Sequence, residues 1–217
     1  MNLEQARFNM IEQQIRPWDV VDKDVLHLLS VVKREDFVPL AHKALTFVDM
    51  EVPLGQGQFM LAPRVEARML QDAAVQKHEN VLEIGTGSGY MAALLAHRAQ
   101  RVISVEINPE LAAMARVNLQ KAGIHNAEVH EFDGSKESSA DGPFDVIVMS
   151  GSVAEVPQVL LSQLKVGGRL IGIIGNEPIM RATVVTRDSE VGFSTRQPWD
   201  TLAPRLLNFP EAPRFQF

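Results

Sequence analysis

The N-terminal segment places apolar side chains at the spacing of helices. Apolar positions recur every three or four residues from Leu3 to about Lys43, which is the period of one helical face. Residues 16–19 interrupt the pattern, and Asp22 or Asp24 is suited to cap the helix that follows. The pattern predicts at least two helices here.

A turn-rich segment links this helical region to the rest of the chain. Residues 53–58 read Pro-Leu-Gly-Gln-Gly-Gln, a composition typical of a loop. Ala62-Pro63 then opens another helix, because proline is tolerated in a first turn. We expect residues 1–79 to form a helical cap that carries a lid loop.

From Asn80 onward, short apolar runs alternate with helical stretches, which is typical of a parallel sheet covered by helices. The clearest helix has Asn108 as its N-cap and Pro109 in its first turn, and Gly123 ends it. The apolar runs predict parallel strands at 80–84, 101–106, 127–131, 144–149 and 168–174.

After Gly175 the apolar pattern weakens. Residues 182–186 and a stretch near 191–195 are suited to antiparallel strands at the sheet edge. The tail, residues 198–217, contains four prolines and little periodicity, so we expect it to lie over the core without forming another element. The predicted fold class is α/β, a Rossmann-like sheet of seven strands, mostly parallel with an antiparallel edge, in a unit that spans residues 80–217 and packs against the N-terminal cap.

Length and composition are those of one compact unit. The chain has 217 residues, a mass of 24.0 kDa and 46% hydrophobic residues, enough for a single core. It has no apolar run of the roughly 18 residues that a membrane span needs, and its first residues lack the pattern of a signal peptide. We expect a cytoplasmic monomer with no membrane partner.

Charge and residue types argue against several chemistries. The net charge is −6 and no run of lysine or arginine occurs, so we expect no nucleic-acid partner, because phosphate contacts need clustered positive charge. The chain has no cysteine, which excludes disulfides and thiolate nucleophiles. None of the six histidines pairs at the i, i+4 spacing of a helical metal site, and we expect no metal.

The most informative motif is a glycine-rich turn after the first strand of the predicted sheet. Residues 81–89 read Val-Leu-Glu-Ile-Gly-Thr-Gly-Ser-Gly, and Glu106 ends the next apolar run. Glycine permits close approach to a ligand, the next helix offers free N–H groups, and a carboxylate about 20 residues on can bind a ribose. The motif predicts a site for a nucleoside-containing molecule.

Three common ligands or activities fit this motif poorly. NAD sites place glycine or alanine where this chain has Tyr90. The phosphate-binding loop of ATP and GTP sites is absent from the sequence. Ser88 has glycines directly on both sides, unlike the serine of a hydrolase elbow. The ligand that remains is S-adenosylmethionine.

Residues at the strand ends suit the parts of this cofactor. The backbone of the glycine turn would contact the methionine moiety, Glu106 the ribose hydroxyls, Ile107 the adenine ring, and Asp133 of the pair Asp133-Gly134 the adenine amino group. Glu83 and Asp133 would also place negative charge near the cationic sulfonium. Asp-Gly is equally a common turn pair, so Asp133 by itself does not separate a binding role from a turn.

Several further motifs occur with the glycine turn. They are Val32–Pro39, the Val-Pro-Leu-Gly-Gln-Gly-Gln stretch at 52–58, Ala62-Pro63, Phe144–Val148 and Leu164–Leu170. Together with residues 81–90, they resemble the protein-L-isoaspartate O-methyltransferase family over roughly residues 30–175. The pairing of the glycine turn with the Gly-Gln-Gly-Gln loop carries most of this resemblance, because many methyltransferases share the turn alone.

The resemblance implies a methyltransferase fold, S-adenosyl-L-methionine as cofactor and S-adenosyl-L-homocysteine as product. The acceptor would be a protein or peptide, at the side carboxylate that appears when Asn or Asp rearranges to isoaspartate. Such a carboxylate is ionised at neutral pH, so transfer needs alignment more than a base. The implied cofactor-binding residues are Gln58, Met60, Glu83, Gly85, Thr86, Gly87, Ser88, Gly89, Tyr90, Glu106, Ile107, Asp133 and Gly134, and the substrate and lid residues are Gln56, Phe59 and Arg64.

The chain departs from the family pattern directly after the Gly-Gln-Gly-Gln loop. The family has Thr-Ile-Ser there and this chain has Phe59-Met60-Leu61, so Leu61 stands at the position of the family's active-site serine. Leaving a buried charged group without a hydrogen-bond partner costs about 1–3 kcal/mol or more. We expect the chain to bind the cofactor and to methylate isoaspartyl peptides weakly or not at all.

Alternatives stay open at this departure. The apolar segment suits a plug over the cleft as well as an altered pocket for a small apolar acceptor. A third function is an inactive cofactor-binding protein that contacts partners through Phe209, Phe215 and Phe217. Arg64 replaces an aromatic residue of the family and would either pair with an acceptor carboxylate or lie solvated on a first helical turn.

Overall fold

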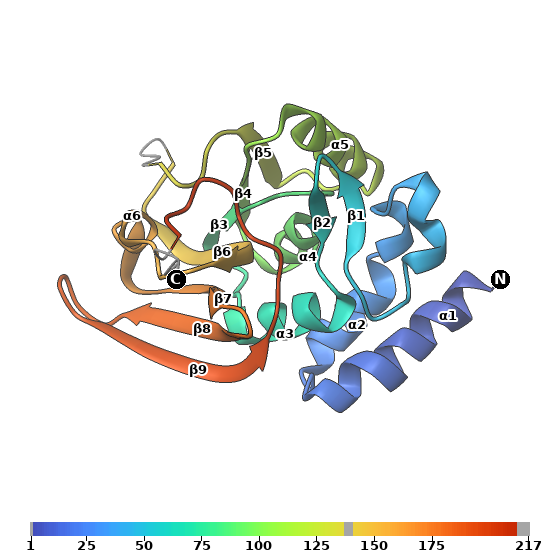
Figure 1. Ribbon diagram of the computed structural model, residues 1–217, viewed down its shortest axis with the longest axis horizontal. Coiled ribbons are helices and arrows are strands. Elements are labelled where there is room, and N and C mark those ends of the chain that lie inside the picture. The colour runs from blue at the N-terminus through green and yellow to red at the C-terminus, as the bar shows by residue number, and fades with distance from the viewer. Residues whose placement is uncertain (1, 137–140, 212–217) are drawn as a thin grey trace, which may run out of the picture.

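A computed structural model of the chain describes residues 2–136 and 141–211, and its centre is a seven-stranded sheet (Figure 1). Across the sheet the strands are β5 (Ala127–Glu131), β4 (Arg101–Glu106), β3 (Asn80–Ile84), β6 (Phe144–Val153), β7 (Leu164–Asn176), β8 (Ile179–Arg187) and β9 (Phe193–Thr201). The first five are parallel, and β8 and β9 run antiparallel to their neighbours. The predicted fold class is confirmed, and the strand order reverses between β3 and β6, where open α/β sheets bind ligands.

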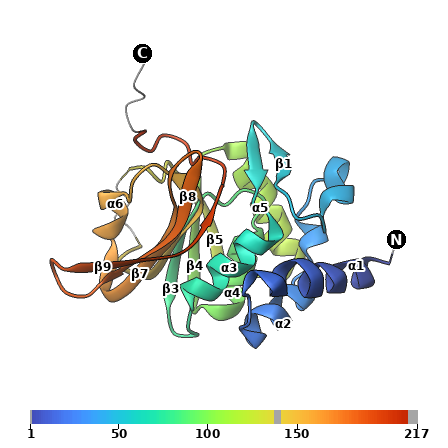
Figure 2. The ribbon, with the colours of Figure 1, turned by 60° about the horizontal axis from the view of Figure 1, so that its bottom comes forward.

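Helices cover the two faces of the sheet unequally. Five helices lie on one side of the sheet, whereas α6 (Gln158–Leu161) and the C-terminal segment cover the other face (Figure 2). The five are α1 (Leu3–Met10), α2 (Lys23–Val31), α3 (Pro63–Ala73), α4 (Tyr90–Arg98) and α5 (Pro109–Lys121). Alternate residues of β3 belong to the two layers, Val81 to the first and Leu82 to the second. Within residues 2–136 and 141–211, no helix is long and apolar enough to cross a membrane.

The N-terminal helices begin and end near the predicted residues. After α1, a π-helical turn, η1 (Ile11–Ile15), and a 3₁₀ turn, η2 (Arg16–Trp18), lead to Asp19, whose φ of 60° ends the helical run. The side chain of Asp22 accepts hydrogen bonds from two N–H groups in the first turn of α2, so this predicted cap is confirmed. Two further 3₁₀ turns, η3 (Arg34–Asp36) and η4 (Leu40–Leu45), complete the N-terminal helical region.

The helix predicted after β4 is also confirmed at both ends. The side chain of Asn108 accepts the N–H groups of Glu110 and Leu111, and Pro109 occupies the first position. Gly123 follows the helix with a φ of +71° and donates its N–H to the carbonyl of Gln120, which is a glycine-terminated helix end.

Residues 53–58 form a hairpin, so the prediction of a loop there is wrong. Strands β1 (Val52–Gly55) and β2 (Gln58–Met60) pair antiparallel. Between them, Gln56 and Gly57 both have positive φ, 54° and 70°, as a tight hairpin turn requires. The glycines and the proline that indicated a loop belong to short strands and to this turn.

The C-terminal segment is only partly as predicted. Residues 198–201 belong to β9, and β9 tolerates Pro198 because it is an edge strand whose outer side needs no ladder hydrogen bonds. Beyond β9 the chain does lie over the core: Ser152 donates its N–H to Pro204, and Leu206 donates its N–H to Ser152. Phe215 and Phe217 lie outside the described residues.

Candidate active site

The carboxyl ends of β3, β4 and β5 open into a hollow that we call the inner cleft. Its lining comes from the residues after these strands, from the β1–β2 hairpin, and from the C-terminal segment. The lining residues are Gln58, Phe59, Ile84, Gly85, Gly87, Val105, Glu106, Ile107, Leu111, Phe132, Asp133, Gly134, Ser150, Pro204, Arg205, Leu206, Leu207 and Phe209. The structure therefore brings together residues of the glycine turn, the acidic strand ends and the lid that are far apart in the sequence.

The glycine turn needs glycine for two different reasons. At Gly85 the φ is +89°, and a Cβ atom there would lie 2.7 Å from the side chain of Leu206 in the C-terminal segment. At Gly89 the φ is +86°, and a Cβ would lie 3.3 Å from the backbone of Ala115 in α5. Gly85 thus faces the inner cleft, whereas Gly89 lets α4 approach α5 and lines none of the hollows described here.

The carboxylate of Glu106 organises the inner cleft. It is 5% exposed and accepts the N–H of Gly87 at 2.8 Å and the N–H of Asn108 at 3.0 Å. A carboxylate has about four acceptor positions, so about two remain for a ligand. Glu106 therefore fixes the glycine turn against the start of α5 and retains the acceptors that a diol would need.

Asp133 joins the inner cleft to the C-terminal segment. Its carboxylate accepts the N–H and hydroxyl of Ser135 at 3.0 and 2.6 Å and the amide of Asn208 at 2.9 Å. Partial burial alone would raise the pKa of Asp133, but these hydrogen bonds outweigh it and lower the pKa to about 2. Asp133 thus closes its own turn, as the sequence allowed, and also carries a full negative charge at the cleft.

Glu83 is more deeply buried than Asp133, and its pKa is shifted in the opposite direction. It is 0% exposed and accepts hydrogen bonds from the hydroxyls of Ser104 at 2.6 Å and Ser150 at 2.7 Å. Burial raises the pKa of Glu83 to about 8, against the lowering effect of these two hydroxyls. Near neutral pH, Asp133 is therefore the more fully ionised of the two carboxyl groups, and it forms an ion pair with Lys136 at 3.4 Å.

A small cavity continues the inner cleft beneath the glycine turn. It is lined by Leu54, Phe59, Met60, Leu61, Glu66, Glu83, Gly85, Thr86, Gly87, Ser88, Tyr90, Met91 and Ser150. It shares Phe59, Gly85, Gly87 and Ser150 with the inner cleft, so the two hollows are adjacent. Five of the predicted cofactor-binding residues line this cavity and do not line the inner cleft: Met60, Glu83, Thr86, Ser88 and Tyr90.

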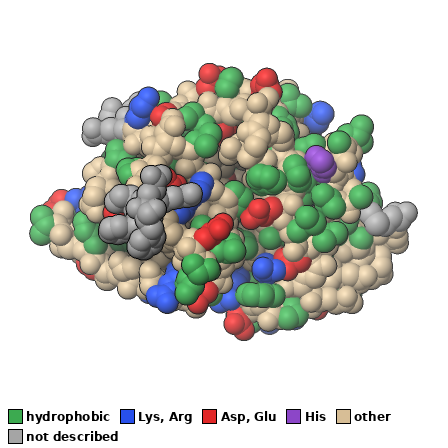
Figure 3. Space-filling model, viewed as in Figure 1, with side chains coloured by type: hydrophobic (Ala, Val, Ile, Leu, Met, Phe, Trp, Pro, Cys, Tyr) green, Lys and Arg blue, Asp and Glu red, His purple; other side chains and the backbone are tan. Residues whose placement is uncertain are grey.

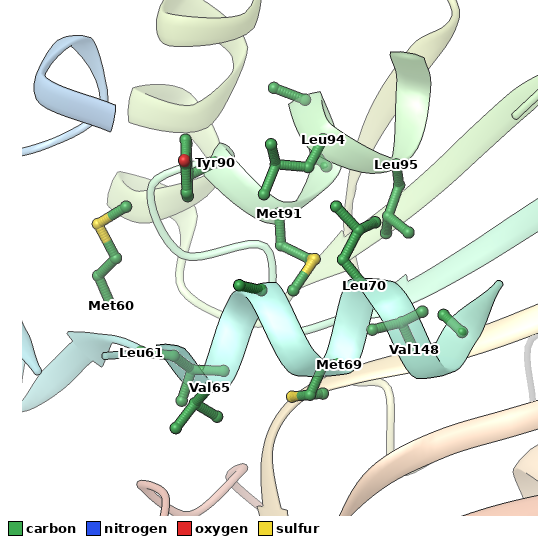
Figure 4. Packing of buried hydrophobic residues seen from close by; sticks show 14 of the residues in the cluster. Met60, Leu61, Val65, Met69, Leu70, Tyr90, Met91, Leu94, Leu95 and Val148 are labelled. Atoms are coloured by element: carbon green, nitrogen blue, oxygen red, sulfur yellow. The ribbon is translucent and has the colours of Figure 1, made fainter. Parts of the chain in front are cut away.

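Leu61 is a buried residue of this cavity. Its side chain is 3% exposed and packs at the beginning of α3, near Val65 (Figure 4). Its carbonyl accepts a hydrogen bond from the guanidinium of Arg34 at 2.7 Å, and the same guanidinium pairs with buried Glu66. The backbone at Leu61 is therefore attached to Arg34 in the N-terminal segment, while the side chains of residues 59–61 form an apolar part of the cavity wall.

Tyr90 also faces the small cavity, and its hydroxyl has no hydrogen-bond partner among the residues that the structure describes. The side chain is 2% exposed, and its ring lies 5.4 Å from that of Phe37. Burial raises the pKa of the Tyr90 hydroxyl. The hydroxyl of Tyr90, the residue that disfavours an NAD site, is therefore a neutral polar group close to the glycine turn.

A third hollow, the outer groove, opens on the surface beside Phe59. Its lining is Trp18, Leu45, Asp49, Met50, Glu51, Pro53, Phe59, Ala62, Arg64, Val65, Pro178, Ile179, Met180, Asp200, Thr201 and Leu202. Phe59 is common to the inner cleft, the small cavity and the outer groove. The side chain of Phe59 therefore separates the predicted cofactor site from the surface that an acceptor would approach.

Arg64 and Gln56, the other two predicted substrate or lid residues, differ in position. Arg64 lines the outer groove, pairs with Asp49, and lies over the ring of Trp18 at 4.4 Å, so it is not simply solvated. Gln56, at the tip of the hairpin, lines none of the three hollows and donates a hydrogen bond to Glu110 at 2.7 Å. It connects the hairpin to the start of α5.

Sequence reasoning missed the residues that close the inner cleft from the C-terminal side. Arg205, Leu206, Leu207 and Phe209 lie in a segment without periodicity, and no sequence signal placed them at the cleft. Ser150 is different, because it lies near the carboxyl end of β6, next to β3 in the sheet. The rule that ligands bind at these strand ends would have found it.

The sheet order, the glycine turn and the acidic strand ends define a Rossmann-like methyltransferase. The sequence model of the family described as protein-L-isoaspartate(D-aspartate) O-methyltransferase matches residues 5–202. The chain belongs to this family. The predicted resemblance and the prediction of an O-methyltransferase are both confirmed.

Curated relatives agree with this assignment, and a solved structure shares the fold. A protein-L-isoaspartate O-methyltransferase of Methanoculleus marisnigri is 41% identical over 78% of this chain and 77% of its own. A second, from Syntrophobacter fumaroxidans, is 39% identical over 88% of this chain and 89% of its own. A Plasmodium falciparum structure assigned as a beta-aspartate methyltransferase, in complex with S-adenosyl-L-homocysteine, shares the fold with a TM-score of 0.77 at 20% identity and covers 94% of this chain and 97% of its own.

Proposed function

We propose that the chain binds S-adenosyl-L-methionine in the inner cleft and transfers its methyl group to the side carboxylate of isoaspartyl residues in proteins or peptides. The observation that supports this most is Glu106. Its carboxylate is held by two backbone N–H groups beside the glycine turn and keeps about two acceptor positions for a ribose diol. Membership of the isoaspartate family supplies the acceptor.

The proposed division of the cofactor site follows from which hollow each residue lines. Glu106, Ile107, Asp133 and Gly134 line the inner cleft and would hold the ribose and adenine. Met60, Thr86, Ser88 and Tyr90 line the small cavity, with Glu83, and would surround the methionine moiety together with Gly85 and Gly87. Gln58 and Phe59 would cover the cofactor from the hairpin.

The bound cofactor would supply an electrophilic methyl group on a positively charged sulfur. In the proposed transfer, a carboxylate oxygen of the acceptor forms the new O–CH₃ bond while the S–CH₃ bond breaks, and the sulfur leaves as a neutral thioether. No proton moves, because a carboxylate with a pKa near 4 is already ionised. The chain's part is to align the two reactants and exclude water, which can lower a barrier by about 7–11 kcal/mol.

The apolar segment 59–61 bears on the rate of this transfer. Phe59, Met60 and Leu61 form part of the wall of the small cavity beside the glycine turn, and this segment has no hydroxyl to donate to an acceptor carboxylate. A hydrogen bond to a charged group contributes about 1.5–3 kcal/mol. We therefore propose that turnover is slow compared with a family member that has Thr-Ile-Ser at these positions.

The substitution Leu61→Ser tests this proposal. A serine hydroxyl at this position should raise kcat/KM for an isoaspartyl peptide about tenfold to a hundredfold, the factor that corresponds to the hydrogen-bond energy. Leu61→Ala is the matched control, since it removes the same bulk and adds no hydroxyl. Initial rates of product S-adenosyl-L-homocysteine formation measure the effect, with the KM for the cofactor followed separately.

Two outcomes would contradict the proposal. Equal rates for the serine and alanine variants would show that the hydroxyl has no role at this position. Tight binding of S-adenosyl-L-homocysteine without turnover of isoaspartyl peptides by either the wild type or Leu61→Ser would favour the inactive binding protein or a different acceptor. The cytoplasmic location and the monomeric state stay predictions from the sequence.

A further inference from the structure

The outer groove carries more negative than positive charge. Its charged lining residues are Asp49, Glu51, Asp200 and Arg64. Arg64 is already paired with Asp49 and covered by the ring of Trp18, so its charge is compensated within the groove. The charge that remains for a ligand is that of Glu51 and Asp200.

These two carboxylates are differently available. Glu51 is half-buried and has no ion-pair partner within residues 2–136 and 141–211, and burial raises its pKa because desolvation disfavours the charged form. Asp200 is mostly exposed and forms a surface ion pair with Arg181 at 3.2 Å, an interaction that is weak in water. A cation arriving in the groove would stabilise the charge of Glu51 and compete with Arg181 for Asp200.

The rest of the groove is apolar and exposed. Phe59 is 42%, Ile179 58% and Leu202 51% exposed, and each lines the groove. Figure 3 shows hydrophobic side chains gathered near the middle of this face, with acidic side chains among them. Apolar side chains exposed together in this way mark a binding surface more often than scattered ones do.

The proposed methyl acceptor is itself a carboxylate, so the acidic groove would repel it. A cationic side chain beside the acceptor residue would offset this repulsion by pairing with Glu51 and Asp200, and neighbouring apolar side chains would cover Phe59 and Ile179. We propose that the outer groove selects polypeptide segments with a lysine or arginine and apolar side chains next to the methylated residue. This inference rests on the proposed function, because it assumes that the acceptor approaches past Phe59.

A binding experiment tests the inference without methyl transfer. Two fluorescein-labelled peptides carry glycine at the acceptor position and the same leucines, one with lysine and the other with glutamate as the flanking residue. Fluorescence anisotropy with the full chain and S-adenosyl-L-homocysteine should show that the lysine peptide binds about tenfold more tightly, which corresponds to about 1.4 kcal/mol. The double variant Glu51→Gln and Asp200→Asn should reduce this preference to about twofold.

A matched control changes the net charge equally at a distance from the groove. The double variant Glu4→Gln and Glu190→Gln removes two exposed carboxylates that line none of the three hollows and should keep the tenfold preference. Equal binding of the two peptides to the wild type would overturn the inference, as would a preference that persists in the groove variant. A peptide preference without isoaspartyl turnover would support the groove's selectivity while contradicting the proposed reaction.

Discussion

Replacement of Glu106 by glutamine is the sharpest perturbation of the proposed cofactor site. The carboxylate accepts two backbone N–H groups, at 2.8 Å from Gly87 and 3.0 Å from Asn108. A glutamine has the same shape but only one acceptor oxygen, and its NH₂ group can only donate. The variant therefore loses the charge and half of the acceptors, and its NH₂ group leaves the N–H of either Gly87 or Asn108 without its acceptor.

The expected loss of cofactor affinity follows from the hydrogen bonds to the ribose. Charged hydrogen bonds contribute about 1.5–3 kcal/mol and neutral ones about 0.5–1.5 kcal/mol, so each of two ribose bonds weakens by about 1 kcal/mol. The sum of about 2 kcal/mol corresponds to an increase of about 30-fold in the Kd for S-adenosyl-L-homocysteine. Isothermal titration calorimetry of the purified chain measures this Kd directly.

The control is Glu131→Gln, on the neighbouring strand. Glu131 is opposite Glu106 in the register of β4 and β5 but is exposed and lines none of the three hollows. Its replacement removes the same charge and should change the Kd less than twofold. An unchanged Kd in Glu106→Gln, with a native circular dichroism spectrum, would refute the assignment of the ribose to this carboxylate.

Three further predictions concern buried and bridging groups. Arg34→Met leaves the buried carboxylate of Glu66 without its cation and should lower the free energy of unfolding by about 3–5 kcal/mol in urea titrations. A variant as stable as the wild type would contradict a stabilising role for this buried ion pair. Burial raises the pKa of Glu83 to about 8, so the native state keeps a proton that the unfolded chain loses near pH 4.5, and the free energy of unfolding should fall as pH rises through this interval. In urea unfolding, Glu83→Gln should flatten this fall between about pH 5 and about pH 9. An identical slope in the wild type and the variant would exclude a contribution from the Glu83 proton. Asn208→Asp keeps a residue that tolerates positive φ, but it replaces the hydrogen bond to Asp133 with a repulsion between two carboxylates. S-adenosyl-L-homocysteine should therefore dissociate about 2–10-fold faster in stopped-flow measurements. An unchanged rate would show that the C-terminal segment does not retain the ligand.

The central strands could be predicted from sequence because they are buried on both faces. The bounds of β3 and β4 agree with the predicted ranges, since each is a short apolar run that ends in a turn or a helix cap. The bounds of β5 also agree, although β5 is an edge strand in which only Val129 is buried. Edge elements gave weaker signals. Strand β9 is mostly exposed, contains Pro198, and has almost no apolar alternation, so its stability comes from pairing with β8.

The candidate site also contains residues that the sequence predicts and residues that it does not. Glu106 and Asp133 could be predicted because parallel strands bring their carboxyl ends to one edge of the sheet. The contact of Leu206 with Gly85 could not, because it joins positions more than a hundred residues apart through a segment without periodicity. The attachment of Leu61 to Arg34 was equally hidden, since it uses a backbone carbonyl that any residue would offer.

The most direct test of the proposed function is transfer of a labelled methyl group to a matched pair of peptides. Purified chain is incubated with methyl-tritiated S-adenosyl-L-methionine and either an isoaspartyl peptide or its aspartyl twin, and the label released as methanol by mild base is counted. The proposal predicts base-labile label in the isoaspartyl peptide alone, at a higher level with Leu61→Ser than with the wild type. Equal label in the two peptides, or label that base does not release, would contradict carboxyl methylation of isoaspartate by this chain.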